Sequence, residues 1–186
     1  TFTVTLDDTT DPIAISQDTT VYLDAGGSVT IDSSFVDNGS SDNCGIVTQT
    51  LDVSTFTCAE VGANTVTMTV TDVAGLTDVS SSTVTVLDTI APQITCPADQ
   101  TEYVDGSDNF TIPDYSSLLT VSDNCDPTPT ITQDPIIGTV ISGIGTVQTI
   151  TMTATDDYGN SSQCTFDITL ADSVTLAITC PGDRDE

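Results

Sequence analysis

Residues 65–71 read TVTMTVT, and residues 149–155 read TITMTAT. In both stretches Thr alternates with Val, Ile, Met or Ala, which is the pattern of a β-strand that buries one face. Threonine supplies 37 of the 186 residues, and its branched side chain favours strands over helices. The pattern therefore predicts an all-β protein built from short, half-buried strands.

The chain contains an internal repeat. Ser41-Asp42-Asn43-Cys44 recurs as Ser122-Asp123-Asn124-Cys125, and the turn Asp72-x-x-Gly75 recurs as Asp156-x-x-Gly159. These spacings define module one at residues 8–87 and module two at residues 88–171. Residues 1–7 are predicted to be the last strand of a preceding repeat, and residues 172–186 the first strand of a following one. Modules of this length with short strands suit immunoglobulin-like β-sandwiches, and we expect two of them, arranged end to end.

The charge of the chain restricts both its partners and its chemistry. It carries 28 acidic residues against one basic residue, Arg184, for a formal net charge of −27. This charge excludes ordinary nucleic-acid binding, and no apolar run is long enough for direct membrane insertion. The chain has no His and no Lys, so general bases and activated nucleophiles are scarce and we expect no enzymatic activity. Divalent cations would neutralise the acidic surface; the alternative is a halophilic or merely solubilising surface.

Module two resembles a hyalin repeat (HYR) domain. The resemblance rests on three motifs: Asp88-x-x-x-Pro92-x-Ile94-x-Cys96-Pro97, Ser122-Asp123-Asn124-Cys125, and Ala154-Thr155-Asp156-x-x-Gly159-Asn160-x-x-x-Cys164-x-Phe166. Module one resembles a sister repeat, but it has Leu76 where the HYR pattern has Asn, and it lacks both outer cysteines. This mixture is similar to tandem repeats in giant secreted cell-surface proteins of Bacteroidota, including gliding adhesins.

Two disulfides are predicted from the cysteines. Alignment of the modules places Cys96 opposite Ser16 and Cys164 opposite Ser80, so both cysteines are absent together from module one. The first strand of an immunoglobulin-like sandwich can run parallel beside the last, which would bring Cys96 and Cys164 together as a disulfide. Residues 46–57 are expected to fold as a hairpin that joins the flanking Cys44 and Cys58 in a second disulfide.

This scheme leaves Cys125 over, or competing with Cys96 for Cys164, because the alignment places Ser142 opposite Cys58. Cys180 matches Cys96, and its partner would lie in the following repeat. A zinc site is a poor alternative, since the chain has no His and no CxxC spacing. Disulfides predict an extracellular location.

The acidic residues of each module gather at its start, at the Asp-Asn-Cys stretch and at the Asp-x-x-Gly turn. In an immunoglobulin topology these three stretches share one pole of the sandwich. Oxygen ligands in that number suit Ca²⁺, which takes roughly six to eight of them. The predicted ligands are Asp8, Asp42, Asn43, Asp72, Asp88, Asp123, Asn124, Asp156 and Asp157. The alternative is that these residues only form Asx-turns.

The resemblance implies a non-catalytic fragment of an extracellular adhesin on the cell surface. Tandem repeats stiffened by Ca²⁺ would form an extended filament for adhesion or gliding motility. Its partners would be neighbouring repeats of the same chain and a surface polysaccharide or protein ligand. The alternatives are a specific glycan- or protein-binding module, with Tyr103, Tyr115 and Tyr158 as candidate contacts, and an accessory domain of a secreted enzyme.

Overall fold

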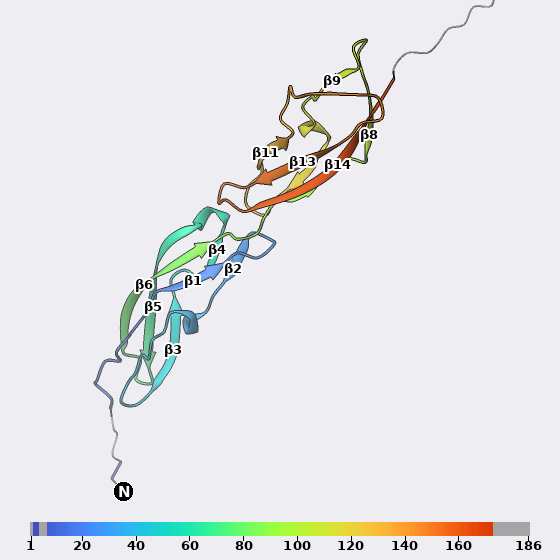
Figure 1. Ribbon diagram of the computed structural model, residues 1–186. Helices are drawn as coiled ribbons and strands as arrows, with labels where there is room; N and C mark the ends of the chain where they lie inside the picture. Colours follow the sequence, from blue (N-terminus) through green and yellow to red (C-terminus); the bar gives the residue numbers. More distant parts are fainter. Residues whose placement is uncertain (1, 4–6, 173–186) are drawn as a thin grey trace, which may run out of the picture. The chain divides into compact units, whose positions relative to one another are not determined.

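The computed structural model describes residues 2–3 and 7–172, whose regular secondary structure is almost entirely β-strand (Figure 1). These residues contain three short 3₁₀ helices and no α-helix, and none of the helices could cross a membrane. They form two compact units. The first holds the described residues up to Ala91 together with Asp123–Pro127, and the second holds Pro92–Ser122 and the described residues from Thr128 onward. The strands predicted within residues 1–7 and 172–186 fall almost wholly outside the described residues.

The first unit combines a four-stranded sheet, in the order β1-β6-β5-β3, with a two-stranded sheet of β2 and β4. Its strands are β1 (Thr19–Tyr22), β2 (Ser28–Thr30), β3 (Ile46–Leu51), β4 (Thr55–Thr57), β5 (Gly62–Asp72) and β6 (Thr77–Leu87). The 3₁₀ helices η1 (Ser33–Phe35) and η2 (Cys58–Glu60) follow β2 and β4. β1 lies parallel to β6, whereas β5 pairs antiparallel with both β6 and β3.

The second unit repeats this plan. Its four-stranded sheet has the order β11-β13-β14-β8, and two-stranded sheets join β9 with β12 and β7 with β10. Its elements are β7 (Gln93–Thr95), β8 (Gln100–Tyr103), β9 (Asn109–Thr111), η3 (Ser116–Leu118), β10 (Thr120–Ser122), β11 (Thr130–Asp134), β12 (Val140–Ser142), β13 (Val147–Thr155) and β14 (Ser161–Ala171). β8 lies parallel to β14, as β1 does to β6. Both units are therefore immunoglobulin-like β-sandwiches in tandem along the chain, as predicted.

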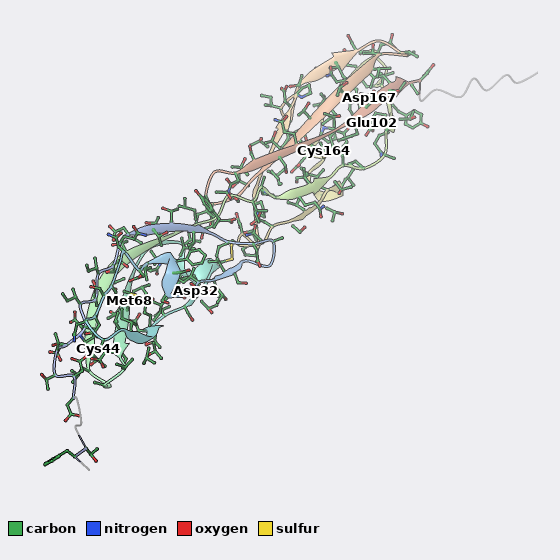
Figure 2. The ribbon with its side chains drawn as sticks, turned by 90° about the horizontal axis from the view of Figure 1, so that it is seen from below. Asp32, Cys44, Met68, Glu102, Cys164 and Asp167 are labelled. Carbon is green, nitrogen blue, oxygen red and sulfur yellow. A yellow bond between two sulfur atoms is a disulfide. The ribbon has the colours of Figure 1, made fainter. Side chains whose placement is uncertain are left out.

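The alternating stretches supply the core of each unit. In β5 the side chains of Val66, Met68 and Val70 are buried while the threonines between them stay partly exposed, and Figure 2 shows Met68 inside the first unit. In β13 the side chains of Ile150 and Met152 are buried in the same way. Burial of these apolar faces is the main driving force for closing each sandwich.

The predicted Cys96–Cys164 disulfide is present, between the chain after β7 and the middle of β14, with a Cα–Cα distance of 5.7 Å. At the equivalent place in the first unit, Ser16 and Ser80 form a hydrogen-bonded pair. Their hydroxyl oxygens lie 2.7 Å apart, and the Ser16 backbone N–H also donates to the Ser80 hydroxyl. A hydrogen-bonded serine pair thus stands where the second unit has a covalent bond.

The predicted Cys44–Cys58 disulfide is wrong. Cys44 carries an exposed free thiol, and Cys58 is bonded to Cys125. Residues 46–57 do not form a hairpin, because β3 pairs with β5 in one sheet while β4 pairs with β2 in the other. The two cysteines consequently lie near different turns: Cys44 precedes Gly45, which bonds the turn after β5, and Cys58 reaches Gly27 in the turn between β1 and β2.

The Cys58–Cys125 disulfide explains why the segment Asp123–Pro127 belongs to the first unit, although it lies in the chain between β10 and β11 of the second. Cys125 also packs against the hydrophobic core of the first unit. The bond spans 67 residues of sequence, so it restricts the unfolded chain strongly.

The serine pair yields a direct prediction. The double substitution Ser16→Cys and Ser80→Cys should form a disulfide under oxidising conditions and stabilise the first unit by about 2 to 4 kcal/mol, because it closes a long loop. Mass spectrometry after alkylation of free thiols detects the bond, and chemical denaturation measures the gain. The control is Ser16→Ala with Ser80→Ala, which should lower stability by about 1 kcal/mol. Thiols that remain fully alkylated in the folded double-cysteine variant would contradict the equivalence.

Candidate metal centre

Asp72 brings a carboxylate to the end of the hydrophobic core. It continues the inward-facing series of Val66, Met68 and Val70 along β5, and its side chain is only 1% exposed. One carboxylate oxygen, Oδ1, accepts a hydrogen bond of 2.8 Å from the backbone N–H of Leu76 across the turn to β6. The same strand alternation that builds the core therefore buries a charged group at its edge.

Two further carboxylates are held by turns in the same way. In Asp42, Oδ2 accepts the backbone N–H groups of Cys44 at 2.7 Å and Gly45 at 2.9 Å. In Asp8, Oδ1 accepts the backbone N–H of Thr10 at 3.1 Å and the side-chain amide of Asn43 at 3.3 Å. These are the Asx-turn contacts of the alternative hypothesis, and each uses one of the two carboxylate oxygens.

The second oxygen of each carboxylate has no such contact. Asp8 Oδ2, Asp42 Oδ1 and Asp72 Oδ2 are buried and make no hydrogen bond within the described structure. The three carboxylates each place an oxygen within 4.8 Å of the others. Two oxygens on opposite sides of one Ca²⁺ lie about 5 Å apart, so this spacing fits a shared calcium ion.

The electrostatics of this group favour a cation. Residues 2–3 and 7–172 contain no Lys, Arg or His, so no cationic side chain of the described structure can balance the three charges. Three like charges at this separation repel, and a buried carboxylate without a partner is costly. Hydrogen bonds, first of all from the Thr10 backbone N–H, hold the pKa of Asp8 below its ordinary value.

The neighbouring Cys44 thiol responds to the same charges. A hydrogen bond to the Asp8 carboxylate, followed by burial and the charges of Asp8, Asp42 and Asp72, raises the pKa of Cys44. The thiol and residues on both sides of it line an open groove on the first unit, together with Val73 and Ala74 from the turn after β5. Figure 2 shows Cys44 at one tip of this unit.

The structure separates the predicted ligands by role. It brings Asp8, Asp42 and Asp72 together, whereas Asn43 directs its amide nitrogen toward Asp8 Oδ1 and toward the sulfur of Cys44, 3.2 Å away. Asn43 thus positions the Asp8 carboxylate through its amide nitrogen. The sequence did not point to the backbone N–H groups of Thr10, Gly45 and Leu76, because backbone donors leave no residue-type signal.

Asp88, Asp123 and Asn124 repeat these contacts one module later. Asp123 Oδ2 accepts the backbone N–H groups of Cys125 at 2.8 Å and Asp126 at 2.9 Å, and Asn124 donates its side-chain amide to Asp88 Oδ1 at 3.0 Å. Asp88 is 6% exposed. The same oxygens accept these bonds in both repeats: Oδ2 in Asp42 and Asp123, and Oδ1 in Asp8 and Asp88.

Asp156 and Asp157 lie in the turn between β13 and β14 of the second unit. Asp156 continues the inward face of β13 and is 6% exposed; its Oδ1 accepts the backbone N–H groups of Tyr158 and Asn160 at 2.9 and 2.8 Å. Asp157 is exposed, and Val73 occupies its place in the first repeat. Of these two residues, only Asp156 has a carboxylate counterpart in the first repeat, Asp72.

Comparisons with known proteins agree with the motif resemblance. Residues 87–170 match the family model of the HYR domain, which is nearly all of module two. No curated protein sequence matches the chain significantly.

Among solved structures, the chain is similar to the fibronectin(III)-like modules of Clostridium thermocellum CbhA, at 13% identity and a TM-score of 0.35, covering 90% of this chain and 96% of that one. It is similar to Sidekick-1 immunoglobulin domains 1–4, at 11% identity and a TM-score of 0.42, covering 87% of this chain and 48% of that one. It is also similar to human protocadherin-24 EC1-2, at 13% identity and a TM-score of 0.43, covering 89% of this chain and 100% of that one. These comparisons establish for the chain the HYR match over residues 87–170.

Proposed function

We propose that this chain is a non-catalytic, adhesion-type module of an extracellular protein, and that Ca²⁺ binds at the start of each repeat. The HYR match, the two disulfides and the immunoglobulin-like sandwiches support the extracellular adhesion-type assignment. The resemblance of its motifs to tandem repeats of Bacteroidota surface adhesins favours a role in an extended cell-surface filament for adhesion or gliding. The repeats of the same chain are then its first partners.

One observation carries the calcium assignment. In the first unit, three carboxylates from separate stretches each keep one buried oxygen without a hydrogen bond, and each places a carboxylate oxygen within 4.8 Å of the others. An Asx-turn alone explains the bonded oxygens but not the buried unbonded ones. Ca²⁺ accepts such irregular sets of oxygens, and solvent can fill its remaining positions, whereas Mg²⁺ requires near-octahedral geometry.

Bound Ca²⁺ would stiffen the first repeat at its start. Asp8 lies ahead of β1, Asp42 lies between η1 and β3, and Asp72 ends β5. An ion held by all three would fix the chain that leads into the unit against the tip of the sandwich. It would also remove the mutual repulsion of the three charges. By the sequence repeat, Asp88, Asp123 and Asp156 are the proposed ligands of module two.

The alternative of a glycan-binding module has fewer available contact residues than the sequence indicates. Tyr115 is 3% exposed, stacks edge-on against Phe166 and donates its hydroxyl to Glu102 at 3.0 Å, so it is a core residue. Tyr103 and Tyr158 are exposed, but they lie on β8 and in the turn after β13. Of the three tyrosines proposed as contacts, one is therefore unavailable to a ligand.

Calcium should raise the melting temperature. A ligand that binds only the folded state stabilises it by about 2.7 kcal/mol at a concentration one hundred times its Kd, which corresponds to a rise of several degrees or more. The measurement is thermal unfolding in Ca²⁺ and in EDTA at equal ionic strength, with Mg²⁺ as the control. Equal melting temperatures in all three buffers would refute the calcium assignment and leave the acidity as surface solubilisation.

Asp72→Asn should have opposite effects in the two buffers. The amide oxygen can still accept the Leu76 N–H bond, so the turn is kept while one charge is removed. In EDTA we expect stability to rise, because repulsion among the three carboxylates falls. In Ca²⁺ we expect it to fall, with the loss of one bound ion by isothermal titration calorimetry.

The charge-matched control for that experiment is Asp11→Asn, because Asp11 is exposed and stands outside the group. It should leave the number of bound ions unchanged. A normal ion count in Asp72→Asn, together with a similar loss in Asp11→Asn, would show that net charge alone is being measured.

A further inference from the structure

We propose that Cys44 is a covalent docking point for a preceding repeat that carries a cysteine like Cys58. The reason lies in Cys125, which occupies the equivalent place in module two. Cys125 bonds Cys58, and Cys58 belongs to η2 of the repeat before it in the chain. The structure thus contains one complete example of a bond from the η2 helix of one repeat to the Ser-Asp-Asn-Cys turn of the next.

The surroundings of Cys44 and Cys125 agree in detail. The Asn43 amide nitrogen lies 3.2 Å from the Cys44 sulfur, and the Asn124 amide nitrogen lies 3.3 Å from the Cys125 sulfur. The backbone N–H of each cysteine donates to the Oδ2 of the Asp two residues earlier, at 2.7 and 2.8 Å. Both sulfurs are therefore presented by the same rigid turn.

The two turns differ in what covers them. Asn124 and Cys125 are partly buried, and the Asn124 carbonyl lies 3.4 Å from the Cys58 sulfur. Asn43 and Cys44 are exposed, and they border the open groove formed with Asp7, Thr10 and Val73. The surface that is closed around Cys125 is open around Cys44, and the Cys58–Cys125 bond identifies the turn of a preceding repeat as the proposed occupant.

The closed example also defines which repeats can be the partner. Gly27 has a positive φ of 72°, and a Cβ atom there would lie 2.8 Å from the Cys58 sulfur and 2.9 Å from the Asn124 carbonyl oxygen. Such contacts are too short, so the partner repeat needs glycine at this position as well as the η2 cysteine. The proposed site at Cys44 therefore accepts a repeat that has glycine at the Gly27 position and cysteine at the Cys58 position. It excludes a repeat with a larger residue at the Gly27 position.

Module two lacks both features. The turn between β8 and β9 places Asp108, at a positive φ of 59°, where the first repeat has Gly27. The register of β9 with β12 places Gly143 after Ser142, at the position of Cys58 after Thr57. The sequence alignment places Ser142 opposite Cys58, and the strand pairing shifts this equivalence by one residue, to Gly143. Module two is consequently a receiver of this bond but not a donor.

Formation of the bond is an oxidation. The Cys44 thiol and the partner thiol lose two electrons and two protons to a disulfide oxidant, for example oxidised glutathione, which leaves as two thiols. The link requires no Ca²⁺, so it can be tested in EDTA. A failure of the calcium assignment would then leave this test intact.

The test inserts a second copy of residues 8–87 between Leu87 and Asp88, in a Cys180→Ser background. The inserted Cys44 then follows a repeat that carries Gly27 and Cys58. Cleavage before Asp places every cysteine in its own peptide. In the inserted copy, Val47→Ile marks the Cys44 peptide by mass and Val53→Ile marks the Cys58 peptide, and both changes are at exposed residues. After oxidative refolding and alkylation, we expect the first Cys58 linked to the inserted Cys44, with one free thiol per chain, the first Cys44.

The Cys96–Cys164 bond and the bond between the inserted Cys58 and Cys125 report correct folding of the extended chain. Gly27→Asp in the first copy is the matched control, and it should abolish the new bond while the other two form. As a second measurement on the unextended chain, Cys125→Ser frees Cys58, which should link to Cys44 of an added wild-type chain. The proposal is overturned if the extended chain forms both reporter bonds, leaves the first Cys58 and the inserted Cys44 alkylated, and the mixed chains do not link.

Discussion

A carboxylate has two oxygens, and three turns of the first unit use only one of them. Asp8, Asp42 and Asp72 each anchor a turn through one oxygen that accepts backbone or side-chain N–H groups. The other oxygen is left buried without a donor. With no cationic side chain among residues 2–3 and 7–172, the proposed cation would be the partner of these oxygens, and turn formation and ion binding would then be two uses of the same residue.

Much of the fold can be predicted from the sequence because local residue patterns determine its strands and turns. The alternation in residues 65–71 and 149–155 matches the observed inward faces of β5 and β13. The joint absence of two cysteines from one repeat identified the Cys96–Cys164 bond, since a paired thiol is useful only with its partner. These inferences need only near neighbours or a comparison of two copies.

The sequence-based predictions fail for features that depend on pairing between strands distant in the sequence. Nothing in residues 46–57 shows that β3 and β4 enter different sheets, and the expected Cys44–Cys58 hairpin fails for that reason. The role of Asp157 could not be separated from that of Asp156 by composition, because only strand phase shows that Asp156 continues an inward face. The sequence also could not show that the Ser-Asp-Asn-Cys turn of one repeat bonds the repeat before it.

The parallel pairing of β1 with β6, and of β8 with β14, has a mechanical consequence. In a parallel pair the start of one strand and the end of the other lie at opposite ends of the ladder. Tension applied along the chain therefore pulls β1 and β6 of the first unit past each other in shear, and the hydrogen bonds between them share the load. In the second unit the Cys96–Cys164 bond joins the chain ahead of β8 to β14 and carries the load covalently. An antiparallel pair pulled from one end would instead open bond by bond, so the first sandwich opposes stretching with a parallel strand pair and the second with a covalent bond.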